Sequence, residues 1–337
     1  MGDPNYEPMT SGKSDLLGPR LDGDANISID VDALNCYRRI HGLPQSSSDT
    51  EDPLWMVGLT RAAQLLEDCG VSATFFVVGR DLEIIPHRRR ARQLAEAGHE
   101  IANHSFDHPY DLRELPEPEL AHQIEGTDRI IEECTGKRPV GFRTPGYNVN
   151  ADVIAFSRRA GHRYDASVFP CISYWVAKAA VMQWRRVRGD ASGSAPTEPW
   201  MLLAPGQPYF PHPIDYWRPA SQPSNYVEIP MATAAFKAFP VIGTSLHLMG
   251  VRGIETIWPW MNRVFRPFFS LEMHAIDFVD VDDIADKPDA EELRRRQPDL
   301  QIPWETKKER YRCIFELLSA HRQPVTLAEA TAEISRG

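Results

Sequence analysis

Residues 99–109 read HEIANHSFDHP, and this stretch joins a short expected strand to a polar turn that Pro109 closes. We interpret residues 99–103 as the strand. If the chain then makes one helical turn, His104 and His108 lie on the same face, four residues apart. Two neutral imidazole nitrogens on one face suit a divalent metal ion. A polar loop is the alternative interpretation, because a metal site also needs a third ligand and a base.

Strand-like and helix-like segments alternate on both sides of this stretch. The buried run VSATFFVVG, for example, lies between two amphipathic segments. Such alternation implies parallel strands with helical crossovers, in a barrel or a doubly wound sheet. In this half of the chain we expect strands over 71–79, 139–142 and 164–169, and helices over 52–70, 85–97, 119–133 and 151–160.

Residues 174–225 interrupt the alternation. Residues 175–188 predict an amphipathic helix, and a loop rich in proline and aromatic residues follows it. The aromatic side chains suit stacking on sugar rings and equally suit packing an irregular loop, and we favour packing with contact at a cleft rim. The alternation then returns, with expected strands over 226–230, 244–248 and 268–278 and expected helices over 254–265 and 304–320.

Composition limits the classes of function. The 337-residue chain carries a net charge of −10, which disfavours binding to nucleic acid or to an anionic membrane surface. We see no apolar run long enough to cross a bilayer and no secretory signal, so we expect a cytoplasmic protein without a transmembrane segment. Five scattered cysteines without a Cys-x-x-Cys pair argue against a disulfide framework. We divide the chain into a flexible segment, 1–26, and one catalytic domain, 27–337, with an insertion at about 174–225.

A second polar cluster ends an earlier strand. Residues 27–32 read ISIDVD, and their alternation predicts a half-buried strand. Asp30 and Asp32 then project from the same side near its C-terminal end. Two carboxylates so close repel each other unless a cation lies beside them. A solvent-facing acidic edge is the alternative.

The carboxyl ends of parallel strands meet at one edge of a sheet or one mouth of a barrel. Two histidines and one aspartate would there form a three-ligand metal set with an open position. A second aspartate would remain as a base, an arginine would keep it ionised, and a distant histidine would serve as an acid. The residues expected at this edge are Asp30, Asp32, His104, His108, Arg143, Asp165 and His274.

At these residues the sequence resembles the polysaccharide deacetylase family, also called the NodB homology domain. The resemblance covers roughly residues 27–330. In its first motif two acidic residues are here separated by one residue instead of adjacent, and Trp175 is the nearest candidate for the tryptophan of the fourth motif. The matching stretches are SIDVD at 28–32, HSFDH at 104–108, RTPGY at 143–147, DASVFP at 165–170 and LEMH at 271–274.

The resemblance implies an α/β fold, a distorted (β/α) barrel of about seven strands. It also implies one divalent metal ion held by Asp32, His104 and His108. Zinc is the default ion, and two imidazoles with one carboxylate also accept cobalt, nickel or iron.

The resemblance further implies the catalytic roles. Asp30 would be the general base, and Arg143 would tether it. The backbone amide of Tyr147 would stabilise the oxyanion. His274 would be the general acid, and Asp165 would tune it.

These residues predict a metal-dependent hydrolase that removes an acyl group, normally acetyl, from an N-acylated saccharide. The alternative is an allantoinase-like hydrolase of a small non-sugar amide, which the lack of a secretion signal favours. The aromatic residues Tyr209, Phe210, Tyr216 and Trp217 favour the saccharide. A third hypothesis is a catalytically inactive carbohydrate-binding module. His247 is the rival acid, and homo-oligomerisation is left open.

Overall fold

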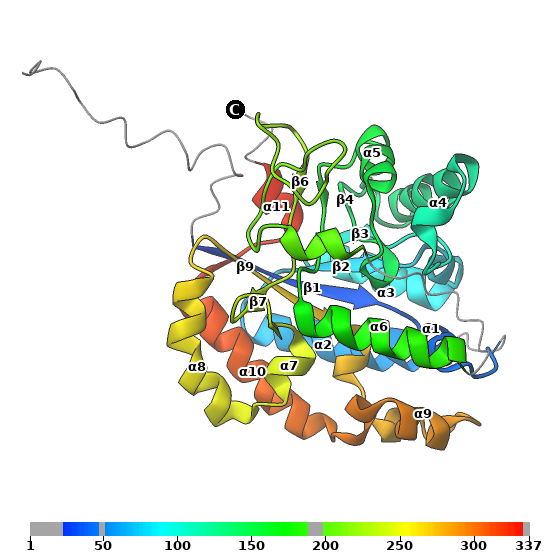
Figure 1. Cartoon of the computed structure of the whole chain (residues 1–337). Helices are drawn as coiled ribbons and strands as arrows, with labels where there is room; N and C mark the ends of the chain where they lie inside the picture. Colours follow the sequence, from blue (N-terminus) through cyan, green and yellow to red (C-terminus); the bar gives the residue numbers. More distant parts are fainter. Residues whose placement is uncertain (1–22, 47–50, 188–197, 333–337) are drawn as a thin grey trace, which may run out of the picture.

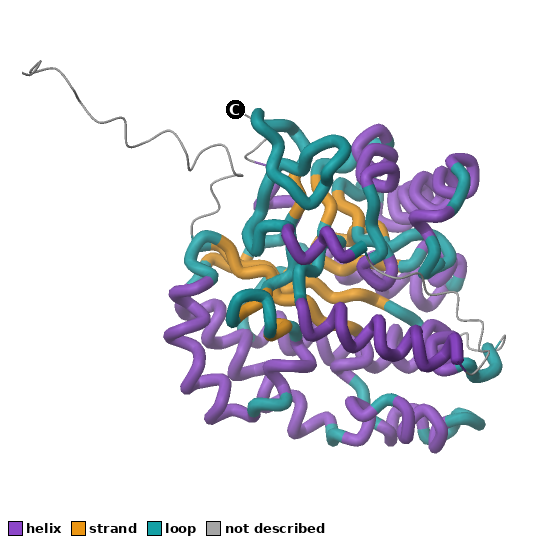
Figure 2. The backbone as a smooth tube through the Cα atoms, in the orientation of Figure 1, coloured by secondary structure: helices purple, strands orange, loops and turns teal. Residues whose placement is uncertain are grey.

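A curved sheet of parallel strands forms the centre of the molecule, and helices cover its outer side (Figures 1 and 2). The structure is a computed structural model that describes residues 23–46, 51–187 and 198–332. The sheet runs in the order β10-β1-β2-β3-β4-β5-β6, and β9 also pairs with β1. All pairings among these eight strands are parallel. The predicted α/β barrel of parallel strands is therefore confirmed, with eight strands in its sheet.

β1 and β9 are the longest strands of the sheet, whereas β4, β5, β6 and β10 are very short. Their bounds are β1 (Asp24–Val31), β2 (Ala73–Val77), β3 (Glu100–Asn103), β4 (Gly141–Phe142), β5 (Tyr164–Asp165), β6 (Val227–Glu228), β9 (Phe268–His274) and β10 (Gln323–Pro324). A separate antiparallel hairpin consists of β7 (Thr233–Ala234) and β8 (Phe239–Pro240).

Helices follow most strands, as crossovers between parallel strands require. Those in the described ranges are α1 (Leu34–His41), α2 (Leu59–Asp68), α3 (Ile85–Glu96), α4 (Glu117–Thr135), α5 (Ala151–Arg159), α6 (Ile172–Val187), α7 (Gly243–His247), α8 (Gly250–Val264), α9 (Ala290–Arg296), α10 (Trp304–His321) and α11 (Leu327–Ala332). None of these helices is both long and apolar enough to cross a bilayer.

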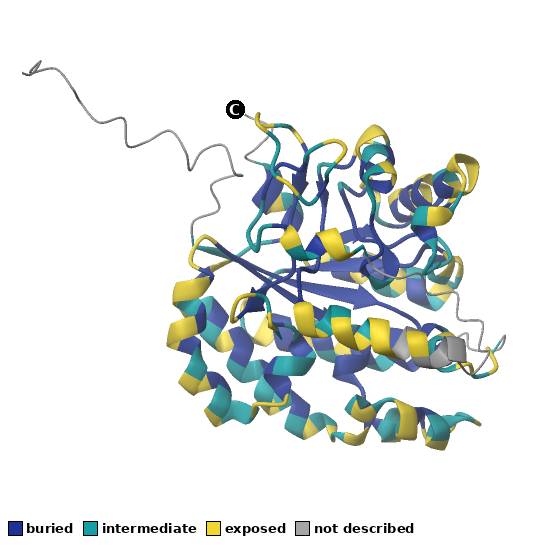
Figure 3. Cartoon of the chain, viewed as in Figure 1, coloured by how far each residue is buried: buried dark blue, intermediate teal, exposed yellow. Residues whose placement is uncertain are grey.

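Helices such as α2 turn an apolar stripe toward the core, and Figure 3 shows the strands buried and the outer helix faces exposed. In α2 the buried residues Leu59, Ala62 and Leu66 recur at helical spacing. A π-helical turn, Leu54–Gly58, leads into α2. A Cβ on Gly58 would lie 2.8 Å from the carbonyl oxygen of Ala275, so only glycine lets this turn pack against the segment that follows β9.

Several local expectations differ from the structure. Residues 243–247 form helix α7, so the strand expected at 244–248 is wrong. The turn after β3 is not helical, since Ser105 and His108 both have positive φ angles. Strand β1 begins at Asp24, three residues before the expected start. Of the flexible segment predicted at 1–26, residues 1–22 lie outside the described ranges.

Candidate active site

Neighbouring strands bring the predicted site residues together at their carboxyl ends. Asp30 lies near the end of β1, where it is in register with Phe76 of β2 on one side and His274 of β9 on the other. His104 follows the last residue of β3. Arg143 follows β4, and its backbone amide donates to the carbonyl oxygen of Asn103.

The three predicted metal ligands converge on one carboxylate oxygen. Oδ1 of Asp32 lies 3.1 Å from Nε2 of His108 and 3.5 Å from Nε2 of His104. This oxygen is buried, and no donor among the described residues hydrogen-bonds to it. A buried carboxylate oxygen without a donor is costly unless a cation compensates it. The donor set of two imidazoles and one carboxylate therefore fits a divalent ion such as zinc.

The ring of His104 is oriented for such a role. Its Nδ1 lies 2.8 Å from the carbonyl oxygen of Arg143. A carbonyl oxygen only accepts, so Nδ1 carries the proton and Nε2 keeps a free lone pair facing Asp32. Nδ1 of His108 instead lies 3.5 Å from Nη2 of Arg39, too long for a good hydrogen bond.

The charges around Asp32 shift the pKa values of all three groups. Burial alone would raise the pKa of Asp32, but His108 and His104 outweigh burial and hold that pKa well below its usual value. Burial would lower the pKa of His104, but Asp30 and Asp32 raise it. In His108 burial prevails, and the pKa is lowered. The carboxylate of Asp32 thus favours the protonated form of the His104 ring, whereas burial favours the neutral form of the His108 ring.

The buried side chain of Arg143 holds the carboxylate of Asp30 in place. Its Nη1 donates to Oδ1 of Asp30 at 2.5 Å, Nη2 donates to Oγ of Ser28 at 2.9 Å, and Nε donates to the carbonyl oxygen of Ala166 at 2.8 Å. The guanidinium also lies over the ring of Phe76, 4.1 Å from the centroid. Arg143 is fully buried, so these contacts fix the orientation of Asp30.

His274 pairs with a residue that the sequence analysis did not single out. Its Nδ1 lies 2.8 Å from Oε1 of Glu272. The hydroxyl of Tyr147 donates to the same oxygen at 3.1 Å. Glu272 and His274 are alternate residues of β9 and so share a face of the strand, a spacing that the sequence could have revealed.

Asp165 does not occupy the predicted position beside His274, and this expectation is corrected. Its two carboxylate oxygens accept from the amide and hydroxyl of Ser167, at 2.9 and 3.0 Å. It also shares a hydrogen bond with Glu228 of the neighbouring strand. Burial raises the pKa of both acids, which fits two carboxyl groups that hold a proton between them.

Two other expectations change. The Tyr147 amide donates to the carbonyl oxygen of Thr144 at 3.1 Å, so it closes a turn here instead of lying free for an oxyanion. His247, the rival acid, lies in helix α7 with its ring 5.2 Å from that of Tyr311. Burial, with Arg310 nearby, lowers its pKa to about 4, which leaves it neutral at physiological pH.

The aromatic insertion is mostly packed. Tyr209, Phe210 and Tyr216 are buried, so their faces are not offered to a sugar. Trp217 is partly exposed and stacks with the exposed Trp200, with 6.1 Å between the ring centroids. Loop packing is therefore the main role of these side chains.

A thiol lies near the candidate metal ligands. Cys36, in the helix α1 that the sequence analysis missed, has its Sγ within 4.8 Å of ligand atoms of Asp32 and His108.

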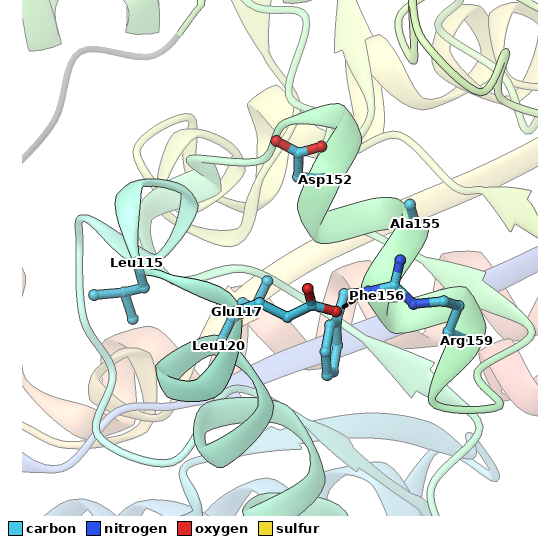
Figure 4. Close-up of a pocket in the computed structure, with 7 residues that line it drawn as sticks. All are labelled: Leu115, Glu117, Leu120, Asp152, Ala155, Phe156 and Arg159. Carbon is cyan, nitrogen blue, oxygen red and sulfur yellow. Dashed lines mark hydrogen bonds and ion pairs between the residues drawn. The ribbon is translucent and has the colours of Figure 1, made fainter.

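A hollow of about 260 Å³ between α4 and α5 is a separate feature (Figure 4). None of the predicted site residues lines it. Its lining consists of Leu115, Glu117, Leu120, Asp152, Ala155, Phe156 and Arg159.

Comparisons with known proteins agree with the motifs. Residues 52–164 match the family model described as polysaccharide deacetylase, a segment that includes His104, His108 and Arg143. A peptidoglycan deacetylase-like protein of Gibberella zeae is 33% identical over 114 residues, which cover 33% of this chain and 33% of that protein. The peptidoglycan deacetylase of Helicobacter pylori is 24% identical over 142 residues, 42% of this chain and 47% of that protein. The alignments thus span between a third and a half of these relatives.

A solved structure shares the whole fold. The crystal structure of a Mycobacterium smegmatis protein assigned as a polysaccharide deacetylase aligns with 94% of this chain and 92% of its own, with a TM-score of 0.54 and 17% identity. The aligned share of the chain is larger than the segment 52–164 that the family model matches.

Proposed function

We propose that the protein is a metal-dependent hydrolase of N-acylated saccharides, with acetyl as the acyl group, because residues 52–164 match the polysaccharide deacetylase family model. The reaction would break the amide C–N bond of the substrate. Water would supply a hydroxyl group to the carbonyl carbon and a proton to the protein. The products would be a carboxylate and a free amine.

Asp32, His104 and His108 would hold the ion. The unpartnered Oδ1 of Asp32 and the oriented ring of His104 support this assignment. When bound, a divalent ion polarises a carbonyl oxygen and lowers the pKa of water toward 7. The two imidazoles and the carboxylate would leave positions open for water and substrate.

Asp30 would accept the proton from the attacking water. Its Oδ2 lies 3.9 Å from Nε2 of His104, beside the candidate metal ligands. Its Oδ1 is engaged by Arg143, which favours the charged carboxylate that a base requires. The nearby guanidinium also limits how far the carboxylate can turn away from the water.

His274 would deliver a proton to the leaving nitrogen. An amine leaves poorly as an anion, so amide cleavage needs an acid at this atom. Register places His274 beside Asp30 across the β1–β9 pair, so base and acid would flank one carbonyl group. This juxtaposition of an Arg143-held acid, a metal-type donor set and a paired histidine is the observation that carries the proposal.

A small non-sugar amide is the alternative substrate. The burial of Tyr209, Phe210 and Tyr216 removes most of the stacking surface that favoured a saccharide. The exposed Trp200 and the partly exposed Trp217 remain as one such surface. The names of the relatives, peptidoglycan deacetylases, support the saccharide.

The test uses the full chain loaded with zinc and assays acetate release from N-acetylglucosamine oligomers and from peptidoglycan. A parallel assay follows ring opening of cyclic ureides. His104→Ala should lose both bound zinc and activity. Asp30→Asn should keep zinc and lose about a hundredfold or more in kcat. His321→Ala, outside the site, is the matched histidine control.

The outcomes separate the hypotheses. Acetate release supports the saccharide, and ureide hydrolysis alone supports the alternative. Bound zinc without hydrolysis of either class would support the binding module and contradict the proposal. An Asp30→Asn variant as active as the unsubstituted protein would show that the base is another group.

A further inference from the structure

We propose that Glu272, supported by the hydroxyl of Tyr147, positions His274 and keeps it protonated. The kinetic part of this inference rests on the proposed function, whereas the pairing itself does not. Asp165, which sequence reasoning placed in this role, is bonded elsewhere.

The geometry is direct. Glu272 and His274 project from the same face of β9, and Oε1 of Glu272 lies 2.8 Å from Nδ1 of His274. The hydroxyl of Tyr147 donates to the same oxygen of Glu272 at 3.1 Å. Since a carboxylate accepts and Nδ1 donates, the contact fixes the ring so that the proton to be delivered sits on Nε2.

The local charges require a cation at His274. Glu272 is almost fully buried, and a buried carboxylate needs a positive partner to remain ionised. The nearest guanidinium, that of Arg143, is held by Asp30 and by two neutral acceptors. Oε2 of Glu272 has no donor among the described residues. The imidazolium of His274 is therefore the direct counter-charge of this acid.

The other charged groups that face His274 act in the same direction. Asp30 in β1 and Asp32 directly after it act on the His274 ring through their negative charges, and Asp277, in the turn after β9, accepts from the His274 backbone amide at 2.9 Å. Burial alone would lower the pKa of His274, but Glu272 above all, and then the two aspartates, raise it well above the usual value.

The substitution that isolates the charge is Glu272→Gln. Glutamine has nearly the same shape and can still accept from Nδ1, so it keeps the ring in place and removes the negative charge. The side chains at positions 272 and 274 would then form a neutral hydrogen-bonded pair. Asp165→Asn is the matched comparison, because it removes a buried carboxylate that does not contact His274 in the described structure.

The primary measurement is the titration of the His274 ring by NMR in zinc-loaded full-length protein, assigned with His274→Gln. In the unsubstituted protein the ring should remain an imidazolium well above the ordinary histidine pKa of about 6.5. Glu272→Gln should lower this pKa by about one unit or more, and Asp165→Asn should leave it in place.

The kinetic measurement follows the same change. Because the acid form is lost as pH rises through the folded pKa, the alkaline limb of the kcat profile should move to lower pH in Glu272→Gln by the same shift. At pH 8 the loss for an amide substrate should be about tenfold or more, and that for an activated ester should be small, since its leaving group needs no proton.

Each result decides a separate claim. An unchanged His274 titration in Glu272→Gln, or a larger shift in Asp165→Asn, would overturn the inference. If Glu272→Gln does not fold, a neutral His274 ring at pH 7.5 in the unsubstituted protein would overturn it equally. If the NMR shifts are as expected but no N-acylated substrate is cleaved, the proposed function fails and the pairing stands.

Discussion

Replacing Arg143 with methionine tests the central electrostatic contact of the site. The side chain is fully buried, and its three nitrogens reach Asp30, Ser28 and Ala166. Methionine keeps much of the packing over Phe76 but leaves the Asp30 carboxylate without its guanidinium. We therefore expect a large loss of stability, which comes more from the buried Asp30 carboxylate left without a counter-charge than from lost packing.

The size of the loss follows from the contacts. Breaking a buried ion pair by removing one partner costs about 3–5 kcal/mol, because the remaining charge stays buried. The lost bonds to Ser28 and Ala166 add roughly 1 kcal/mol each. A domain with about 5–15 kcal/mol of total stability would be severely weakened by Arg143→Met. Arg159→Met, which breaks an exposed pair with Glu117, should cost about 1 kcal/mol or less.

Guanidinium denaturation of metal-free protein measures both variants, and a double-mutant cycle tests the cause. Arg143→Met combined with Asp30→Asn removes both charges. The double variant should therefore lose about 2 kcal/mol less free energy of unfolding than the sum of the losses in the two single variants. Additive effects, or a cost for Arg143→Met similar to that of Arg159→Met, would refute the claim that Arg143 compensates a buried Asp30 charge.

Three further predictions concern other parts of the molecule. Excess zinc should stabilise the protein by about 2.7 kcal/mol at a hundred times Kd, and Asp32→Asn should abolish this gain in thermal melts. Burial lowers the pKa of His87 to about 4, so the free energy of unfolding should fall by up to about 1.4 kcal/mol per pH unit through this residue as pH drops from 6.5 toward 4. His87→Phe should flatten that slope in denaturant titrations. Gly141→Ala should destabilise the fold by about 1–3 kcal/mol, because its Cβ would lie 1.8 Å from the Tyr164 ring, whereas Gly206→Ala, with no atom within 4 Å, should be nearly neutral by the same assay.

The sequence was sufficient where a local pattern has a direct geometric meaning. Alternation over 27–32 put Asp30 and Asp32 on one side of a strand, and the strand-helix rhythm implied parallel strands whose ends meet. Those two inferences are enough to bring His104, His108 and Arg143 to the same place. They depend on neighbouring residues and on topology, not on the detailed packing of side chains.

The sequence was insufficient where the partner is chosen by packing across strands. Asp165 could face either His274 or the strand on its other side, and it bonds with Glu228 of β6 because those two residues are in register. Residues 244–248 have the apolar alternation of a strand, yet they belong largely to helix α7. The hydroxyl of Ser245 accepts a hydrogen bond from the backbone amide of Ile242 and so stabilises the start of this helix. The outcome in both cases depends on the energy difference between two competing arrangements, and a single sequence does not give that difference.

The charge balance of the site argues for one metal ion and against two. A second cluster, Asp30 with Glu272 and His274, also places ligand-type atoms within 4.8 Å of one another. Its carboxylates are already compensated, Asp30 by Arg143 and Glu272 by the His274 ring. A cation there would have to displace a proton from His274 and face the guanidinium at close range, which Coulomb repulsion opposes. Oδ1 of Asp32 is buried beside two imidazoles and accepts no hydrogen bond from the described residues, so zinc should bind there with a stoichiometry of one, and Glu272→Gln should leave that stoichiometry unchanged.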